Sequence, residues 1–285
     1  MSPRDIRAPD AMRPGFTVRC VVLDLDGTCL DAMQRLHPRV RDAVRSAARR
    51  LPVIVATGRM YLSALPWARE LHIDLPLVCY QGAVVRDIPR ATEGLGELFF
   101  EAPLAPEPSL RALRVARRHR WHYQAYQDEK LLCEEDRPEA HLYARIAQIP
   151  ITFVDDLEPL LRRGTTKAVC VIEDAGEVKR CIETMSRELG AAARVTRSMP
   201  QFVEIVNPAV SKAAAVELTL GRAGLTLAEA VAVGDAPNDL EMLAAAGFAV
   251  AVATAAPEVL AVVAATCAPP ERAGVADVLE ALALC

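Results

Sequence analysis

The sequence predicts an α/β protein: a doubly wound, Rossmann-like parallel sheet core with an inserted α+β cap domain. Two observations predict the sheet. Short, continuous apolar runs recur along the chain, and segments with apolar residues at helical spacing separate them. Such runs are typical of parallel strands covered on both faces, and strands that alternate with helices are typical of doubly wound folds. A third observation, the aromatic-rich texture of residues 84–200, predicts the insertion.

The core strands are predicted from runs with few polar residues. Strands buried on both faces lack the polar–apolar alternation of a half-exposed strand. The runs are residues 21–25, 53–56, 77–80, 231–233 and 248–252.

Three segments between these runs carry helix signals. Residues 38–50 place Val40 and Val44 at helical spacing. Ser211 is a typical N-cap for a helix over 211–222. Gly247 is a typical stop for a helix over residues 238–246.

The middle of the chain predicts mixed α and β structure. Side chains alternate in character over residues 121–133, on both sides of the turn-like segment Asp128-Glu129-Lys130, and this pattern predicts a hairpin. Further strands are expected at 166–172 and 202–206, and a helix at 176–189. The resulting domains are a discontinuous core of residues 1–83 and 201–285, with 1–17 as a loose polar tail, and a cap of residues 84–200.

The composition is that of an ordinary globular protein with 285 residues, a net charge of −4 and a pI of about 5.8. This mild acidity gives no general field for nucleic acid or an anionic membrane, so neither partner is expected. A local group of arginines is interpreted as a solvated helix face. It consists of Arg111, Arg114, Arg117, Arg118 and Arg120.

The location is predicted to be cytoplasmic. The eight cysteines form no CxxC pair, which favours free thiols over a disulfide frame or a zinc site. The N-terminus has no apolar signal region. Residues 243–270 carry only one formal charge, but they are mostly alanine and are interrupted by Gly247 and Pro257, so they predict core elements instead of a membrane span.

Four short segments carry the polar residues expected of a site. They are DLDGT at 24–28, ATGR at 56–59, NPAVSK at 207–212 and GDAPND at 234–239. DLDGT, ATGR and GDAPND each follow a predicted strand, whereas NPAVSK opens a predicted helix. Ligands of open α/β sheets bind at the carboxyl ends of the strands, so these segments are expected to converge.

Four aspartates in one place require a counter-charge. Mg²⁺ takes oxygen ligands and is usually held by one or two carboxylates plus substrate phosphate. Thr57 and Lys212 can hold phosphate oxygens, and Asp24 can attack phosphorus as a nucleophile. Asp26 can act as general acid and base. A calcium loop is excluded, since the positions for its Gly and Glu are Cys29 and Arg35.

These motifs, in this order, resemble the haloacid dehalogenase-like superfamily of phosphohydrolases. The resemblance covers nearly the whole chain after about residue 18. It implies Mg²⁺-dependent hydrolysis of a phosphate ester through an aspartyl phosphate. In this resemblance Asp24 is the nucleophile and a metal ligand, and Asp26 is the general acid and base and a metal ligand through its backbone carbonyl. Thr57 and Lys212 are further catalytic residues that bind the phosphate. Asp235 is a metal ligand, and Asp239 supports the metal site. Gly58, Arg59, Gln81 and Asn238 are assigned to phosphate and substrate binding.

The Cof-like branch, with a type IIB cap, is the closer resemblance. TGR at 57–59, YQGA at 80–83 and FVEIVNPAVSK at 202–212 carry it. Departures from the branch include Gln81 where its members usually have Asn, and Ala209 where they usually have Gly. Since the catalytic positions are intact, these departures bear on substrate fit more than on catalysis.

The leading hypothesis is a phosphatase for a small phosphorylated metabolite such as a sugar phosphate, acting as a monomer or homodimer. The second Asp of DxD argues against a dehalogenase. A phosphomutase of the same superfamily, or a non-catalytic phosphoacceptor or binding protein, remains the alternative. Cap residues could contact the substrate, although packing is the more common role for each. They are Trp121, His122, Tyr123, Tyr126, Arg145, Lys167 and Arg197.

Overall fold

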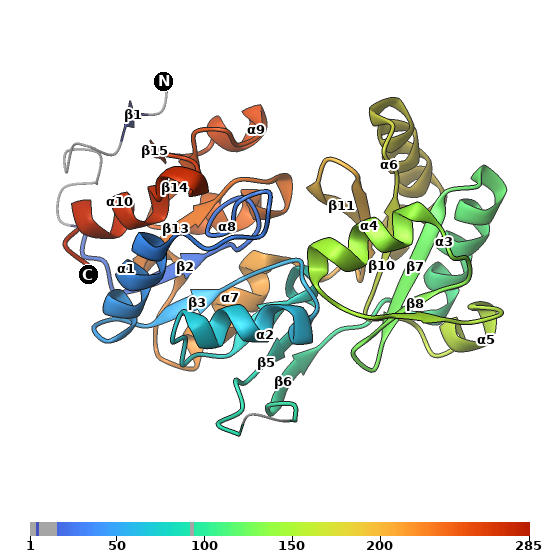
Figure 1. Cartoon of the computed structure of the whole chain (residues 1–285), viewed down its shortest axis with the longest axis horizontal. Coiled ribbons are helices and arrows are strands. Elements are labelled where there is room, and N and C mark those ends of the chain that lie inside the picture. The colour runs from blue at the N-terminus through green and yellow to red at the C-terminus, as the bar shows by residue number, and fades with distance from the viewer. Residues whose placement is uncertain (1–3, 6–15, 92–93) are drawn as a thin grey trace.

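The protein consists of two lobes that lie side by side (Figure 1). The computed structural model describes residues 4–5, 16–91 and 94–285. One lobe, the core, combines the blue and orange-to-red parts of the chain, and the other, the cap, is green to yellow. The middle of the chain is therefore inserted between two halves of the core, as the sequence predicts.

The core is built on a parallel six-stranded sheet with the strand order β1-β15-β14-β13-β2-β3. Adjacent strands run in the same direction because helical crossovers connect them. The predicted runs at 21–25, 53–56, 231–233 and 248–252 are confirmed as strands of this sheet. The strands are β1 (Arg4–Asp5), β2 (Cys20–Leu23), β3 (Val53–Val55), β13 (Ala230–Gly234), β14 (Phe248–Val252) and β15 (Ala265–Cys267).

Helices cover both faces of the core sheet, which makes it doubly wound. In β2, Val21 and Leu23 belong to the apolar cluster that also holds residues of α1, α2 and α10. Cys20 and Val22 belong to the cluster of α7, α8 and α9 on the opposite face. The helices are α1 (Pro38–Ala48), α2 (Tyr61–Glu70), α7 (Lys212–Gly221), α8 (Leu240–Ala245), α9 (Pro257–Leu260) and α10 (Gly274–Ala281).

The predicted helix signals act locally as expected. Ser211 is the N-cap of α7, and its hydroxyl accepts a hydrogen bond of 3.2 Å from the Ala214 amide. The segment 238–246 differs slightly, since a 3-10 turn, η5 (Pro237–Asp239), precedes α8. The other 3-10 turns are η2 (Tyr80–Gly82), η3 (Gly190–Ala192), η4 (Leu227–Glu229) and η6 (Pro270–Arg272).

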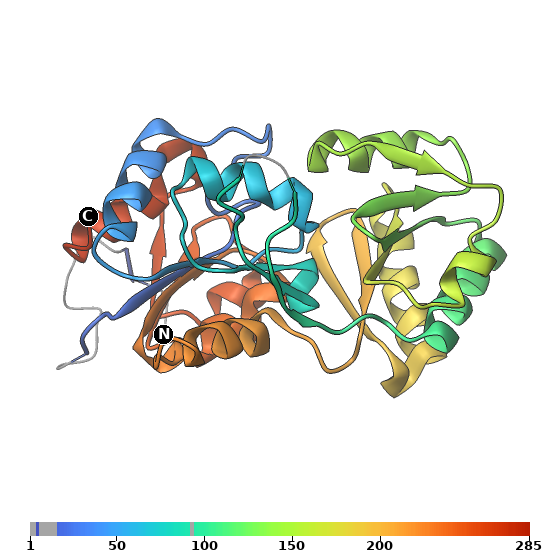
Figure 2. The same ribbon diagram turned by 90° about the horizontal axis from the view of Figure 1, so that it is seen from below.

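The cap is a second six-stranded sheet with the order β11-β12-β10-β7-β8-β9. It is antiparallel except at β8–β9. Helices α3 and α6 pack on one face, and α4 lies on the other (Figure 2). The strands are β7 (His122–Gln127), β8 (Lys130–Cys133), β9 (Ile151–Phe153), β10 (Lys167–Val171), β11 (Arg194–Met199) and β12 (Phe202–Val206), and the helices are α3 (Pro106–His119), α4 (Pro138–Ala147), α5 (Glu158–Leu161) and α6 (Ala175–Leu189).

Three segments lie differently from the expected domain limits. Strand β12 pairs with β10 and β11 in the cap sheet, although residues from 201 onward were expected in the core. Strand β4 (Leu77–Cys79) joins the core sheet only through a bridge between Ala56 and Val78. It instead forms a three-stranded antiparallel sheet with β5 (Val84–Arg86) and β6 (Leu98–Glu101), which were expected in the cap.

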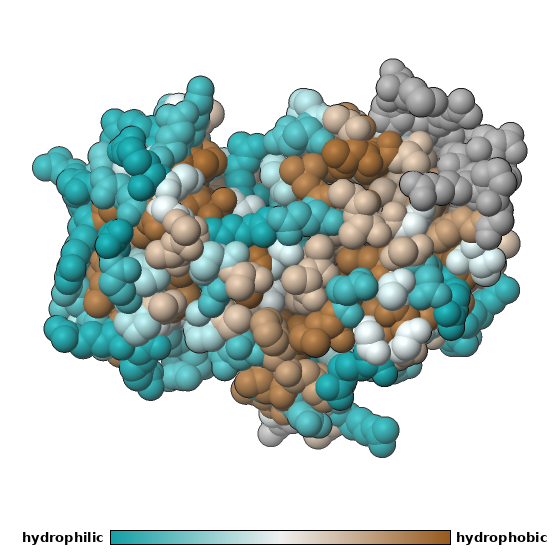
Figure 3. Space-filling model, turned by 180° about the vertical axis from the view of Figure 1, so that it is seen from behind, coloured by the Kyte–Doolittle hydropathy of each residue, from teal (hydrophilic) through white to brown (hydrophobic). Residues whose placement is uncertain are grey.

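The surface shows where these elements leave apolar side chains uncovered. Apolar colour gathers over the region of β5 and β6 at the lower edge in Figure 3. Leu95 and Leu98, at the turn and in β6, are exposed by 48% and 40%. Within the predicted tail, Arg4–Asp5 form β1 beside β15, and most of the remaining tail lies outside the described residues. The described part of the chain contains no helix long and apolar enough to cross a membrane.

Candidate active site

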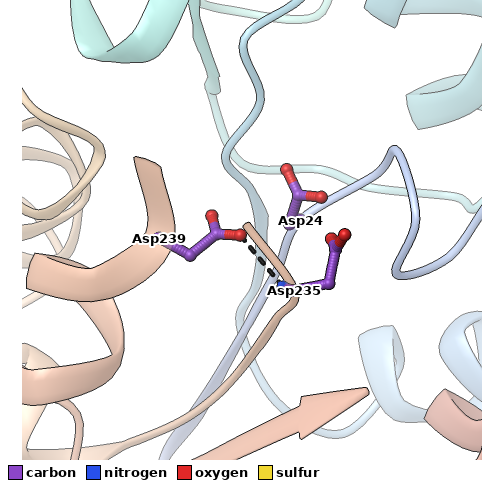
Figure 4. Close-up of side chains that lie close together, drawn as sticks. All are labelled: Asp24, Asp235 and Asp239. Carbon is purple, nitrogen blue, oxygen red and sulfur yellow. Dashed lines mark hydrogen bonds between the residues drawn. The ribbon is translucent and has the colours of Figure 1, made fainter. Parts of the chain in front are cut away.

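Three aspartates meet at the carboxyl ends of the core strands. Asp24 follows β2, Asp235 follows β13, and Asp239 lies in the turn η5 (Figure 4). Each offers a carboxylate oxygen, and these oxygens lie within 4.8 Å of one another. Three oxygen donors at this spacing fit a hard divalent cation.

Lys212 supplies a positive charge to this cluster. Its Nζ lies 2.5 Å from Asp24 Oδ1 and 2.7 Å from Asp239 Oδ1. The lysine is the first residue of α7, so the helix start fixes its position. Burial lowers the pKa of the Lys212 ammonium, but the charges of Asp239 and Asp24 raise it more, so its pKa lies above the ordinary value. Lys212 is therefore held in its charged form.

Burial and crowding oppose ionisation of Asp24 and Asp235. Burial is the main cause that raises the pKa of Asp24 well above its ordinary value, against the lowering effect of Lys212. Burial and then the charge of Asp239 raise the pKa of Asp235 to about 7. With three carboxylates and one ammonium, the cluster favours the uptake of a cation.

The loops around the cluster hold the carboxylates in place. Thr28 Oγ1 donates a hydrogen bond of 2.8 Å to Asp235 Oδ1. Asp239 Oδ2 accepts hydrogen bonds of 3.1 Å from the amides of Asp235 and Ala236, the first of which Figure 4 marks. Asp239 thus orients the loop that carries Asp235. Thr28 has no role predicted from the sequence, although it lies in DLDGT.

Asp26 lies in different surroundings from Asp24. Both of its carboxylate oxygens accept hydrogen bonds from the Arg59 guanidinium, at 2.8 and 2.6 Å. Arg59 is 4% exposed and also donates to Ser63 Oγ at 3.2 Å and to the side chain of Gln34. The two aspartates of DLDGT therefore lie in different environments, Asp24 beside Lys212 and Asp26 beside Arg59.

The ATGR segment forms a buried loop beside Asp26. Thr57 is fully buried, and its Oγ1 accepts a hydrogen bond of 3.1 Å from the Arg59 amide. The Gly58 carbonyl accepts a hydrogen bond of 2.7 Å from the Lys167 ammonium of the cap. A side chain at Gly58 would collide with Gln81, since a Cβ there would lie 2.3 Å from Gln81 Nε2.

A buried polar chain connects the core to the cap next to this loop. Asn238 Nδ2 donates to Gln81 Oε1, and Gln81 Nε2 donates to Glu204 Oε2, each at 2.8 Å. Glu204 also pairs with Lys167 at 2.9 Å, and both side chains are almost fully buried. Gln81 and Asn238, assigned to the substrate from the sequence, thus contact each other. The Oδ1 of Asn238 has no partner among the described residues.

A cavity of about 30 Å³ lies between the lobes above Asp24 and Asp26. Its core side is formed by the predicted residues Gly58, Arg59 and Asn238. Its cap side was not predicted from the sequence, because five of its seven residues are apolar or aromatic and carry no signal for a site. The cap residues are Tyr143, Ile146, Ala147, Ser198, Met199, Phe202 and Glu204.

The cap residues proposed from the sequence lie elsewhere. Trp121, His122 and Tyr123 line a separate groove of the cap. Tyr126 and Lys167 are fully buried, Arg145 is exposed, and Arg197 lines a third groove. Among the described residues, none of these seven lines the cavity. The arginines of α3 form exposed ion pairs, for example Arg117 with Glu134 at 2.5 Å, as expected of a solvated face.

The fold and the site together define a class: capped α/β enzymes that act through an aspartate cluster at the sheet edge. The chain belongs to the family described as haloacid dehalogenase-like hydrolase, which matches residues 21–279. Related proteins include an HMP-PP phosphatase of Cronobacter sakazakii, 27% identical over 85% of this chain and 87% of that protein. A phosphoglycolate phosphatase of Archaeoglobus fulgidus is 26% identical over 94% of this chain and 99% of that protein.

Solved structures agree in fold. A haloacid dehalogenase-like hydrolase from Bacteroides thetaiotaomicron is 25% identical, with a TM-score of 0.80 over 93% of this chain and 99% of that one. A sugar phosphatase described as subclass IIB has a TM-score of 0.79 over 94% of this chain and 100% of that one, at 17% identity. The predicted relationship to Cof-like phosphohydrolases with this cap is confirmed, and the chain is a phosphoric monoester hydrolase.

Proposed function

We propose that the protein is a Mg²⁺-dependent phosphatase that hydrolyses a phosphate monoester of a small metabolite through an aspartyl phosphate. The observation that carries this proposal is the pairing of Asp24 with Lys212 inside the buried aspartate cluster. A carboxylate held by a fixed cation at the end of a strand is a preorganised nucleophile.

Asp24 and Lys212 share the first step. The Lys212 ammonium binds Oδ1 of Asp24, which leaves Oδ2 for attack on phosphorus. The positive charge of Lys212 also attracts the phosphoryl oxygens, and it opposes part of the pKa increase that burial causes in Asp24. The hydroxyl of Thr57, whose oxygen accepts from the Arg59 amide, is free to donate to the phosphoryl group.

Asp26 is proposed to transfer protons. The Arg59 guanidinium fixes the Asp26 carboxyl group beside the cavity, where it can take a proton from the water that hydrolyses the aspartyl phosphate. Protonation of the leaving oxygen is proposed to use the same carboxyl group, because the Asp26 and Arg59 side chains both line the cavity.

The donor set fits Mg²⁺. The side chains of Asp24 and Asp235 and the backbone carbonyl of Asp26 would hold it, and Asp239 would keep Asp235 in place. The ion supplies Lewis-acid stabilisation of the phosphoryl charge. Asn238, whose buried Oδ1 has no partner among the described residues, is proposed to accept a hydrogen bond from the substrate.

A direct test compares phosphate release by the wild type and Asp24→Asn, with and without Mg²⁺. We expect release to depend on the ion and to fall by about a thousandfold or more in the variant, as for other removed nucleophiles. Asp42→Asn, at an exposed position of α1, is the matched control and should keep full activity. Full activity of Asp24→Asn would refute the nucleophile assignment.

The cysteines support the proposal that the enzyme works in a reducing cytoplasm. Cys20, Cys29, Cys79, Cys133, Cys170 and Cys181 are free thiols, and all six are buried. Burial raises the pKa of Cys20 and of Cys133 to about 12, so these thiols stay protonated and unreactive.

A further inference from the structure

The cap presents mainly apolar groups to the position of the leaving group. Tyr143 and Ile146 of α4, Met199 of β11 and Phe202 of β12 line the cavity on this side. The rings of Tyr143 and Phe202 lie 4.8 Å apart at an angle of 46°, so they form one aromatic surface. Polar contact on the cap side comes from Ser198 and Glu204. A leaving group therefore meets an apolar and aromatic wall.

The cavity offers no uncommitted cation to that leaving group. Among its described lining residues, Arg59 is the only Lys or Arg, and Asp26 binds it through two hydrogen bonds. Lys167 lies behind the wall, where Glu204 and the Gly58 carbonyl bind its ammonium. A carboxylate or second phosphate on the leaving group would lose its hydrating water without gaining a positive partner, which is unfavourable for any buried charge.

The space beside the cavity is acidic. A groove of about 450 Å³ shares Asp26, Ile146, Ser198 and Met199 with the cavity. It adds the carboxylates of Asp31, Asp235 and Glu271, and its described lining residues include no Lys or Arg. Arg35 pairs with Asp31 at 2.7 Å, Arg59 pairs with Asp26, and Asp235 is a proposed ligand of Mg²⁺. The groove therefore keeps the negative charge of Glu271 and offers no Lys or Arg among its described lining residues to a negative group. A long leaving group that extends into the groove is therefore disfavoured when it carries a negative charge.

We infer that the substrate is a phosphate monoester whose leaving group is uncharged or cationic and has an apolar or aromatic face. This inference rests on the proposed phosphatase function and narrows it. It disfavours bisphosphorylated sugars, and with them a phosphomutase, because the second phosphate would lie against the wall and the acidic groove. It equally disfavours phosphorylated carboxylic acids.

Three matched esters test the inference: benzyl phosphate, 4-(aminomethyl)benzyl phosphate and 4-carboxybenzyl phosphate. They share one ring and one reacting group and differ in a distant charge. We expect kcat/KM for the neutral and cationic esters to exceed that for the carboxylate by about tenfold or more, since like charges in a desolvated site repel. Phosphonate analogues, with CH₂ in place of the ester oxygen, should show the same order in dissociation constants measured by calorimetry.

A variant tests whether the missing cation is the cause. Ile146→Lys places an ammonium where cavity and groove meet, and it should reduce or reverse the discrimination against the carboxylate. His141→Lys, at an exposed position of the same helix, is the control and should leave the order unchanged. If Ile146→Lys does not fold, the comparison of the three esters with the wild-type enzyme still tests the inference.

The outcomes separate this inference from the proposed function. Equal or better turnover of 4-carboxybenzyl phosphate, with Mg²⁺- and Asp24-dependent release from p-nitrophenyl phosphate, would overturn the inference alone. No release from any ester would overturn the proposed function and the inference that depends on it.

Discussion

Gly27 sets the distance between the DLDGT loop and the aspartate cluster. Its φ of +82° lies in the left-handed region, and a Cβ would lie 2.4 Å from Asp235 Oδ2. We expect Gly27→Ala to displace Asp235 and to weaken Mg²⁺ binding by about tenfold or more, the usual effect of disturbing a ligand's support. Calorimetric titration with Mg²⁺ measures this.

Gly94 provides the matched control for Gly27. Its φ is +94°, but no atom lies within 4 Å of the position of a Cβ. Gly94→Ala should therefore cost only backbone strain, about 1 kcal/mol of unfolding free energy, and leave Mg²⁺ affinity unchanged. Equal Mg²⁺ affinities of the two variants would show that contact with Asp235 does not matter.

Asp235 predicts an unusual pH dependence of stability in the absence of divalent cations. Burial raises its pKa to about 7 in the folded protein, whereas an unfolded chain has an Asp pKa of about 3.9. The folded state therefore binds the proton more tightly, so stability is highest below the unfolded pKa and is lost as the pH rises toward 7.

Urea unfolding of the wild type and Asp235→Asn in a chelator measures this effect. From pH 5 to pH 8, the wild type should lose about 2–3 kcal/mol more than the variant, since each pKa unit corresponds to about 1.4 kcal/mol. A wild type that gains stability relative to the variant over this range would contradict the raised pKa.

The residues proposed to contact the phosphoryl group and the metal were predictable because their chemistry is unusual at strand ends. Asp24, Thr57, Lys212 and Asp235 are polar or charged where an apolar strand stops or a helix begins. The apolar cap wall was not predictable, since Tyr143 and its neighbours resemble any packed surface in the sequence. Glu204 carried a usable signal, a carboxylate inside the apolar run FVEIV.

At the scale of elements, β10 and β12 of the cap share a buried ion pair, and its lysine also binds the ATGR loop of the core. Lys167 begins β10, Glu204 lies within β12, and their side chains are 0% and 2% exposed. Lys167 also lies over the rings of Tyr126 and Tyr143, 5.2 and 5.9 Å from their centroids. Lys167→Met should cost about 3–5 kcal/mol, because Glu204 would keep a buried charge without its partner.

A second change tests the cause of that loss. Adding Glu204→Gln to Lys167→Met removes the unpaired charge and should restore part of the stability. Lys179→Met, at an 80% exposed lysine of α6, should stay within about 0.5 kcal/mol of the wild type. Urea unfolding measures all three, and a double variant less stable than the single one would argue against the ion pair as the cause.

The elements themselves were predictable where local signals were strong. The apolar runs of β2, β13 and β14 and the N-cap of α7 follow from the sequence. Partner strands were harder to predict, because pairing depends on distant residues. Nothing within FVEIV says that β12 pairs with β10 instead of a core strand, and the short strand β15 has no long apolar run.

At the scale of the whole molecule, the two lobes close the site. The cavity of about 30 Å³ is smaller than a phosphate ester, so we expect the cap to move from the core when the substrate binds. The sequence predicted two lobes from the insertion of residues 84–200, but it could not predict this closed arrangement, which depends on contacts between distant side chains. Glu129 makes one of these contacts. It lies in the β7–β8 turn of the cap and accepts a hydrogen bond of 3.1 Å from the Leu62 amide of the core.

Glu129 caps the first turn of α2, where a negative charge is favoured by the helix dipole. We expect Glu129→Gln to weaken the closed state, so that the radius of gyration measured by small-angle X-ray scattering rises in the absence of ligand. Addition of Mg²⁺ with orthovanadate, which can occupy the phosphoryl site, should restore the wild-type value, because ligand contacts then favour closure. Lys130→Gln, the adjacent exposed residue, is the control. An unchanged radius for Glu129→Gln in both conditions would mean that this contact does not contribute to closure.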